Sequence, residues 1–305
     1  MLSRRSVLAS AMALAACQPQ SHVTGRPQKL IAVTMDDFNL SFDIKLSPAA
    51  RNDAILAAFD AHNHKAGGFI TGRFVDAPEG KSVVQSWSDA GHLVGNHSWT
   101  HLNSSDEDAK LIEADILKND AALSGFSAYE KIFRFPFLAE GGTEEKVALY
   151  RAFLKTNGFA NAPVTIDSLD WFITDRMEKR LRENPKADVS GYRDYYIQLV
   201  RDVALQKHEL ALKLGYNDLP HTLLVHHNVL NGLFLEDVMD ALVADGWSFV
   251  DAKAALAHPL YKLEPKTPNR GRSVLSVLAI EQGIKPGFPE KYYGFGRDYM
   301  ESLGL

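Results

Sequence analysis

The fold of this chain is constrained most by a set of short apolar segments, each of which ends in polar side chains. Residues 29–35 (KLIAVTM) lead directly into Asp36 and Asp37, and residues 92–96 (HLVGN) lead into a polar stretch. Helix-like segments separate these strands, and the alternation predicts an α/β fold. In parallel α/β barrels the carboxyl ends of the strands gather at one face, so the polar clusters are expected to converge. The pattern recurs at residues 131–137, 159–170, 222–227 and 247–251.

The length of 305 residues accommodates one α/β barrel of about 250 residues together with extensions. We predict a single domain over residues 28–258. Within it, residues 172–221 form a charged, strongly helical insertion, which would sit beside the site and could roof it. Residues 259–305, with several Pro, Gly and aromatic residues, form a C-terminal extension that is expected to pack on the same domain.

The N-terminus predicts export and lipid anchoring. Residues 1–5 are basic and residues 6–16 are apolar, a run too short to span a bilayer but suited to a signal peptide. The signal over residues 1–17 ends in LAAC, which resembles a bacterial lipobox, and Cys17 is the single cysteine of the chain. Residues 18–27 would then be a linker on the periplasmic side of a bacterial membrane. Gln18 favours the outer membrane, and the alternative is a cleaved signal with an incidental cysteine.

Charge argues against nucleic acid as a partner. The formal net charge is -5, and Lys and Arg are scattered along the chain instead of forming a basic cluster. Hydrophobic residues make up 46% of the chain and charged residues 23%, which is the balance of an ordinary globular protein. The partners that we expect are therefore a substrate and, through the N-terminal lipid, a membrane.

The stretch from His97 to His101 indicates a metal site. Two histidines four residues apart would face the same side of a helical turn, within reach of one ion. Asp36 or Asp37 can complete a set of three ligands that leaves positions open for water and substrate. Neighbouring residues on a strand point to opposite faces, so the two carboxylates are expected to have different roles.

Five motifs, taken together, resemble the polysaccharide deacetylases, which are carbohydrate esterase family four or the NodB-homology group. The motifs occur in family order and cover roughly residues 28–255. The family fold is a distorted (β/α) barrel with about seven parallel strands, in agreement with the strand-end pattern. The residues that carry the resemblance are Thr34-Met35-Asp36-Asp37-Phe38, His97 to His101, Arg134-Phe135-Pro136-Phe137, Asp167-Ser168-Leu169-Asp170-Trp171 and Leu224-Val225-His226.

The resemblance implies a division of roles. Asp37, His97 and His101 would bind one divalent metal ion, zinc or alternatively cobalt or another divalent ion, which activates a water and polarises the acetyl carbonyl. Asp36 would be the general base, and Arg134 would orient it and hold it ionised. The Phe137 N–H would stabilise the oxyanion, as the general acid His226 protonates the departing amine. Asp170 would orient His226 and raise its pKa, and Trp171 would face a sugar ring or wall the pocket.

Structural roles are the alternatives to catalysis or binding at several of these positions. The two aspartates could cap a turn, Arg134 could form a surface ion pair, and Trp171 could be a core residue. His227 competes with His226 for the role of acid, because neighbours on a strand face opposite ways, although the Leu-x-His spacing favours His226. Asp167 is interpreted as bracing its loop. The histidines without a motif are interpreted as surface or packing residues: His22, His62, His64, His92, His208, His221 and His258.

Two departures from the family pattern concern the substrate. Phe38 stands where glycine is usual and could narrow the cleft or redirect the following loop. The third motif usually ends Pro-Tyr-Gly, but here Phe137 and Leu138 follow the proline, so a tyrosine hydroxyl and a flexible glycine are lost.

The sequence therefore predicts a metal-dependent hydrolase that removes N-acetyl groups from a chitooligosaccharide, peptidoglycan or an exopolysaccharide. A second hypothesis keeps this scaffold but changes the bond to a non-sugar amide or imide, or to an O-acetyl ester. The third hypothesis is a glycan-binding lipoprotein without catalytic activity. The joint presence of ligand, base and acid candidates argues against it.

Overall fold

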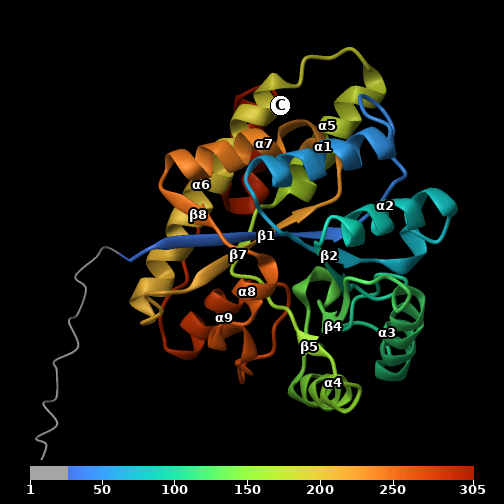
Figure 1. Ribbon diagram of the computed structural model, residues 1–305. Coiled ribbons are helices and arrows are strands. Elements are labelled where there is room, and N and C mark those ends of the chain that lie inside the picture. Colours follow the sequence, from blue (N-terminus) through green and yellow to red (C-terminus); the bar gives the residue numbers. More distant parts are fainter. Residues whose placement is uncertain (1–26) are drawn as a thin grey trace, which may run out of the picture.

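The computed structural model describes residues 27–305, whose strands form one parallel sheet (Figure 1). Within this range the sheet has eight strands in the order β5-β4-β3-β2-β1-β7-β6, with β8 pairing to the start of β1. The predicted α/β fold with about seven parallel strands in a distorted barrel is confirmed. The strands are β1 (Lys29–Asp37), β2 (Gly67–Ile70), β3 (Leu93–Asn96), β4 (Tyr129–Phe133), β5 (Ala160–Asn161), β6 (Ile166–Asp167), β7 (Pro220–His226) and β8 (Trp247–Phe249).

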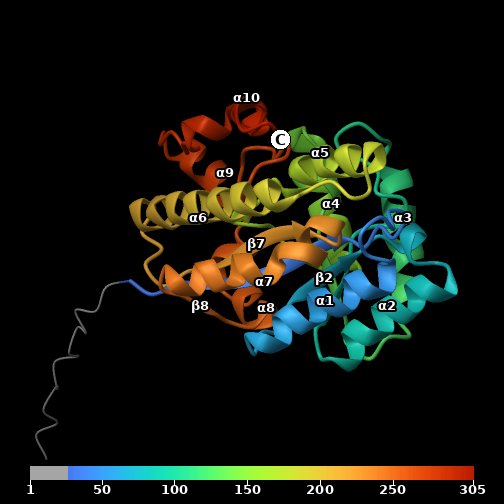
Figure 2. The same cartoon turned by 90° about the horizontal axis from the view of Figure 1, so that it is seen from above.

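Helices alternate with the strands and cover the sheet (Figure 2). The central strand β1 is buried on both faces, with Ile31, Val33 and Met35 inaccessible to solvent, as expected of a parallel strand between helical layers. The helices are α1 (Pro48–Ala61), α2 (Pro78–Asp89), α3 (Ala109–Leu123), α4 (Glu144–Thr156), α5 (Asp170–Glu183), α6 (Ser190–Lys213), α7 (Val229–Ala244), α8 (Ala252–Leu256), α9 (Val274–Glu281) and α10 (Arg297–Ser302).

The register of the sheet brings the motif residues to one edge. Asp36 on β1 pairs with His226 on β7, and Asp37 pairs with Ile70 on β2. Ile70 in turn pairs with Asn96, the last residue of β3 before His97. Because these strands are parallel and hydrogen-bonded in series, residues from three distant motifs lie at the same carboxyl edge.

Two of the strand bounds expected from sequence were wrong. The apolar run at residues 131–137 ends as a strand at Phe133, because Pro136 has no N–H for a ladder and starts a 3₁₀ turn, Pro136–Leu138. The segment 159–170 contains two strands of two residues each, and α5 begins at its last residue. No pairing joins these short strands, β5 and β6, within the described residues, so the barrel stays open there.

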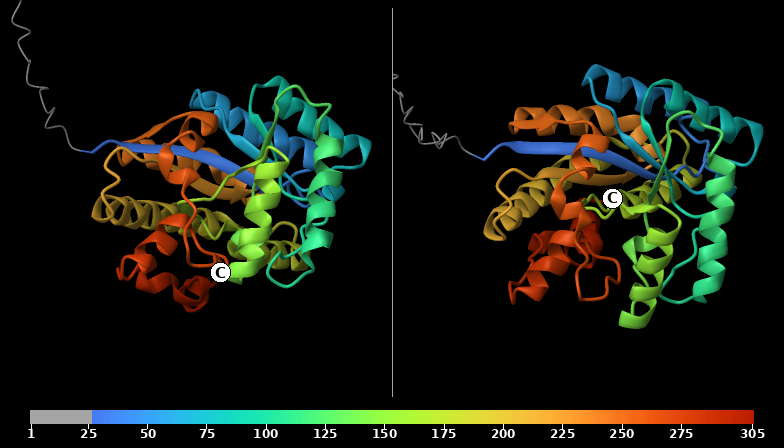
Figure 3. Two further views of the ribbon diagram at one scale, coloured as in Figure 1. Left: turned by 90° about the horizontal axis from the view of Figure 1, so that it is seen from below. Right: turned by 60° about the horizontal axis from the view of Figure 1, so that its bottom comes forward.

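The helical insertion and the C-terminal segment pack on each other. The predicted insertion contains most of α5 and all of α6, and α6 lies against the red C-terminal segment that includes α9 and α10 (Figures 2 and 3). Leu210 and Ala211 of α6 share a buried cluster with Leu275 and Ala279 of α9. The C-terminal segment is therefore held on the face of α6 that lies away from α7.

The signal, lipobox, Cys17 and all but the end of the linker predicted at the N-terminus fall in residues 1–26, outside the described residues. They stay predictions, as does the lipid-anchored location that depends on them. Between residues 27 and 305, none of the helices has both the length and the apolar character required to cross a membrane.

Candidate metal centre

The two histidines of the second motif lie in an irregular loop after β3, so the helical turn expected from their spacing was wrong. Ser98 and His101 both adopt left-handed backbone conformations, with φ of 62° and 59°. The N–H groups of Trp99 and Thr100 donate to the Asp115 carboxylate at 2.9 Å instead of joining a helix. This side-chain acceptor replaces the backbone acceptors of a helical turn and holds the loop in shape.

Three potential ligand atoms converge at this loop. The His101 Nε2 atom lies 3.1 Å from Asp37 Oδ1, and His97 Nε2 lies 3.5 Å from the same oxygen. One ligand atom from each of these residues lies within 4.8 Å of the others. A single divalent cation could therefore be bound by this group, which has the mixed nitrogen and oxygen donors that zinc accepts.

The chemistry of the ligands fits a metal ion. Asp37 Oδ1 is buried and has no hydrogen-bond partner among the described residues. The His97 Nδ1–H donates to the Arg134 backbone carbonyl at 2.8 Å, which leaves Nε2 free to face the centre. Burial favours a higher pKa for Asp37, but the nearby His101, together with the charges of His226 and His97, lowers the pKa below its ordinary value. The carboxylate is thus ionised, as a metal ligand must be.

The neighbouring Asp36 has a different environment. Its Oδ1 atom accepts a hydrogen bond of 2.6 Å from Arg134 Nη1, and both side chains are almost completely buried. Arg134 also donates to Thr34 Oγ1 and to the Ala162 carbonyl, and its guanidinium lies 3.8 Å from the centre of the Phe69 ring. Arg134 therefore forms a buried ion pair with Asp36 and not the surface ion pair considered from the sequence.

Strand alternation does not separate the two carboxylates as expected. Asp37 has a φ of 73°, so β1 turns at its last residue. Asp36 Oδ2 lies 3.6 Å from His97 Nε2, close to the 3.5 Å that separates Asp37 Oδ1 from the same nitrogen. The two carboxylates differ in their partners instead, because Asp36 faces the Arg134 guanidinium and Asp37 faces His101.

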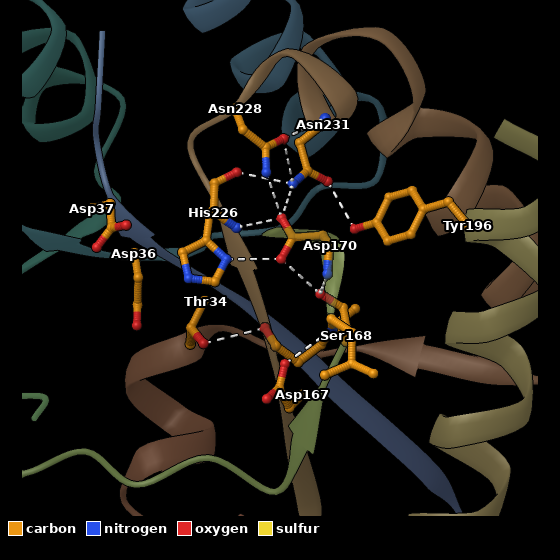
Figure 4. Close-up of polar contacts among 12 residues, drawn as sticks. Thr34, Asp36, Asp37, Asp167, Ser168, Asp170, Tyr196, His226, Asn228 and Asn231 are labelled. Atoms are coloured by element: carbon orange, nitrogen blue, oxygen red, sulfur yellow. Dashed lines mark hydrogen bonds and ion pairs between the residues drawn. The ribbon is translucent and has the colours of Figure 1, made fainter. Parts of the chain in front are cut away.

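His226, on β7 beside Asp36 of β1, forms a hydrogen-bonded pair with Asp170 (Figure 4). The His226 Nδ1–H donates to Asp170 Oδ1 at 2.8 Å, and the His226 backbone N–H donates to Oδ2 at 2.8 Å. Burial lowers the pKa of His226, but the charge and hydrogen bond of Asp170, with the charges of Asp37 and Asp36, raise it to about 10. The Asp170 carboxylate therefore favours the protonated form of His226.

Asp170 is fully buried and is surrounded by donors that the motif comparison did not identify. The side-chain amides of Asn228 and Asn231 donate to its Oδ2 atom at 2.8 and 2.7 Å, and the Ser168 hydroxyl donates to Oδ1 at 3.1 Å (Figure 4). The two asparagines follow His226 by two and five residues, at the start of α7. Their closeness to the fifth motif is the signal that could have indicated them.

His227 lies behind the cleft, in the core. Its imidazole is buried and stacks on Phe38, with 4.9 Å between ring centres, and burial lowers its pKa to about 3. Of the two adjacent histidines, His226 is the one that lines the cleft. Phe38 is also buried, with its ring edge-on to Trp87, and does not line the cleft. The prediction that Phe38 narrows the cleft is therefore wrong. The left-handed φ of 61° at Phe38 explains why glycine suits this position.

Phe38 is expected to stabilise the fold in spite of its strained backbone. The substitution Phe38→Ala removes a buried ring, so the free energy of unfolding should fall by roughly 3–5 kcal/mol. Phe137→Ala is the matched control, because Phe137 also has a left-handed φ, of 58°, but an exposed ring. Denaturant unfolding should show a change within about 0.5 kcal/mol for this control. Equal losses in the two variants would contradict the packing role.

The candidate ligands, Asp36 and His226 share a cleft with a volume of about 420 Å³. Trp171 and the exposed Phe137 line it, the latter with its ring edge-to-face against His101 at 4.6 Å. No hydrogen bond from the Phe137 N–H is found within residues 27–305. Asp167, which braces the loop as expected by accepting from the Leu169 N–H at 3.0 Å, also lines the cleft.

The helical insertion lies beside this cleft, as expected, because its Thr174 lines a neighbouring pocket that shares Trp171 and His226 with the cleft. None of the described residues 172–221 lines the cleft itself. Instead, Gly271 and Phe295 of the C-terminal segment close one side, and the Phe295 ring meets Trp171 at 5.0 Å. No motif marks Gly271 or Phe295, and only the folded chain reveals their position.

The remaining histidines lie apart from this cleft. His64 and His92 are buried and accept backbone hydrogen bonds from Val33 and Ala66, and His221 is buried beside Trp247. They are packing residues, as interpreted from the sequence. His22 falls outside the described residues.

Comparison with known proteins supports the resemblance. Residues 24–152 match the family model described as polysaccharide deacetylase. The search of curated proteins found no match.

Solved structures of similar fold include the Bc1960 peptidoglycan N-acetylglucosamine deacetylase, with a TM-score of 0.52 and 19% identity over 76% of this chain and 89% of that one. PdaC, a peptidoglycan deacetylase from Bacillus subtilis solved as a mutant, has a TM-score of 0.50 and 18% identity over 76% and 92%. A mutant of a family four pseudoenzyme with restored activity, whose wild type is from Bacillus anthracis, has a TM-score of 0.52 and 20% identity over 76% and 69%.

At these identities the likeness concerns the fold. The family match over residues 24–152 adds the first two motifs, with Asp36, Asp37, His97 and His101, to that likeness. Over residues 24–152 the chain is therefore similar to the polysaccharide deacetylase family, and its fold resembles that of solved structures from carbohydrate esterase family four.

Proposed function

We propose that this protein is a metal-dependent hydrolase that removes N-acetyl groups from an N-acetylated glycan. The observation that carries the proposal is the arrangement of one cleft. Asp36, backed by Arg134, and His226, backed by Asp170, line it together with the metal-binding candidates Asp37, His97 and His101. A hydrolase of an amide needs these parts: an activated water, a base and an acid.

The residues of the chain have complementary tasks in this reaction. A divalent ion held by Asp37, His97 and His101 would supply a Lewis acid that activates water and polarises the acetyl carbonyl. Asp36 takes the proton of the attacking water, and Arg134 fixes the direction of its carboxylate through the 2.6 Å hydrogen bond. The free N–H of Phe137 donates to the oxygen of the acetyl group as its negative charge develops.

The departing amine needs a proton before the carbon–nitrogen bond breaks. His226 supplies that proton from Nε2, because its Nδ1–H is engaged with Asp170. Trp171 and Phe295 form an aromatic wall at one side of the cleft, and a sugar ring can lie against such faces. The base Asp36 and the acid His226 are paired residues of the neighbouring strands β1 and β7.

Acetate release from N-acetylglucosamine oligomers is the experiment that tests this function. We expect release that a chelator abolishes and zinc restores. His97→Ala should lose the metal, measured by elemental analysis, and with it nearly all acetate release. His258→Ala is the control, because this histidine lies outside the cleft and should leave metal content and rate unchanged.

Three outcomes separate the alternatives. Turnover of an imide or an O-acetyl ester without acetate release from any N-acetylated sugar would favour the second hypothesis. Binding of glycan without turnover of any substrate in the presence of zinc would favour a non-catalytic protein, as in the pseudoenzyme of similar fold. Release that persists in metal-free protein would contradict the metal-dependent mechanism.

A further inference from the structure

A second cavity opens beside the cleft, between α6 and the C-terminal segment. We call it the side pocket. Its volume is about 280 Å³, and it shares Asp167, Leu169, Gly271 and Phe295 with the cleft. Figure 2 shows α6 and the red C-terminal segment, which supply the other walls, lying against each other. The side pocket therefore directly adjoins the cleft.

Lys207 is the unusual residue of the side pocket. It lies on α6 and is only 5% exposed, and its Nζ donates to Ser276 Oγ at 3.0 Å. No carboxylate lies within 4.0 Å of Nζ among the described residues, although a buried ammonium group is costly unless it is paired. Burial lowers the pKa of Lys207 to about 8, against an opposing effect of Asp167, so the group remains charged at neutral pH.

The side chains around Lys207 leave hydrogen-bond donors unused. Ser276 Oγ and Ser273 Oγ lie 3.0 Å apart, so one hydroxyl donates to the other and one hydroxyl proton of the pair remains unused. Lys207 keeps two N–H groups beyond its bond to Ser276. Arg272, which is exposed, adds a guanidinium to the same lining.

The balance of charge favours an anion. The lining holds two cationic side chains, Lys207 and Arg272, against the single carboxylate of Asp167. One oxygen of that carboxylate already accepts from the Leu169 N–H. Asp167 also lines the cleft, so it lies at the junction of the two cavities. A negatively charged ligand group with several acceptor atoms would supply the hydrogen-bond and charge partners that Lys207 lacks.

We infer that the side pocket binds an anionic substituent, such as a carboxylate, carried by the glycan whose N-acetyl group lies in the cleft. The inference rests on the proposed deacetylase function and narrows its substrate class to acidic acetylated glycans. The alternative is that Lys207 has a purely structural role and holds α9 in place through Ser276. The two differ in what they predict for a substrate with its charge removed.

The test compares two tetrasaccharides that differ only in charge. One is built from alternating N-acetylglucosamine and glucuronate, and the other is its methyl ester. Calorimetry on the full-length protein should show about tenfold tighter binding of the acid, the effect of one well-placed charged contact. Lys207→Met should reduce this preference to within about twofold and leave binding of the ester unchanged. Lys213→Met, at an exposed lysine of the same helix, should keep the full preference.

Two further measurements keep the test decisive. Arg272→Gln changes an exposed residue and should reduce the preference about threefold even if Lys207→Met does not fold. Equal binding of acid and ester by the wild-type protein, or an unchanged preference for the acid in Lys207→Met, would refute the anion-binding role of the side pocket. Acetate release is followed in the same samples. Preference for the acid without acetate release would contradict the deacetylase activity but support anion binding in the side pocket. Acetate release without this preference would refute only the anion-binding role of the side pocket.

Discussion

Asp36→Asn is expected to lower kcat for acetate release by about 10³-fold while the metal content stays at the wild-type level. The amide keeps the shape of the side chain, and its oxygen can still accept the hydrogen bond that Arg134 now donates at 2.6 Å. It cannot take a proton from water. The variant should therefore be folded and loaded with metal, but almost inactive. Acetate release and elemental analysis on the same preparation measure the two effects.

The matched control for this variant is Asp37→Asn, the same change at the neighbouring position. Asp37 lies 3.1 Å from His101 Nε2 and is the candidate ligand, so this change should reduce bound metal as well as activity. If Asp36→Asn instead empties the site and Asp37→Asn keeps the metal, the division of roles between the two aspartates is the reverse of the one proposed. Retention of full activity in Asp36→Asn would eliminate Asp36 as the base.

Asp170→Asn should change both the rate and its dependence on pH. Asp170 raises the pKa of His226, which reaches about 10 in the wild-type protein, and His226 must be protonated to act as an acid. Loss of the carboxylate charge lowers this pKa, so the alkaline limb of the kcat profile should move to lower pH. At neutral pH we expect kcat to fall by about 10²-fold or more, because the ring also loses the acceptor that orients it.

The control for the pH shift is Asp188→Asn, an exposed aspartate in the turn before α6, which should leave the alkaline limb in place. A kcat that falls in Asp170→Asn without movement of the limb would mean that Asp170 holds the loop but does not set the proton affinity of His226. A limb that moves to higher pH would contradict the sign of the electrostatic effect. pH profiles of kcat for the wild type and both variants decide between these results.

Much of the fold could be predicted because its signals are local. Apolar segments such as residues 29–35 and 222–227 are long enough to be recognised as buried strands, and they form β1 and β7, two neighbours at the centre of the sheet. The segment 159–170 could not be resolved in the same way. Its two strands contain only two residues each, and they form by pairing with β4 and β7, which are distant in sequence.

The backbone conformations at the site could not be predicted from the spacing of residues in the sequence. The spacing of His97 and His101 favours a helical turn, but Asp115 on α3 captures the N–H groups of Trp99 and Thr100. In the same way, strand alternation separates Asp36 from Asp37 only if β1 stays extended, and Asp37 is left-handed. In each case a partner or a turn outside the local pattern changes the direction of a side chain.

The sequence by itself predicted the fold class and, through its motifs, the candidate set of Asp36, Asp37, His97, His101 and His226, because these residues follow strands whose carboxyl ends meet in a parallel sheet. The tertiary structure alone decided what surrounds them. It turned Phe38 into the core, closed the cleft with Gly271 and Phe295, and placed Lys207 in the side pocket. The physical reason is that strand periodicity is a property of neighbouring residues, whereas the walls of a cavity are built from contacts between segments far apart in the chain.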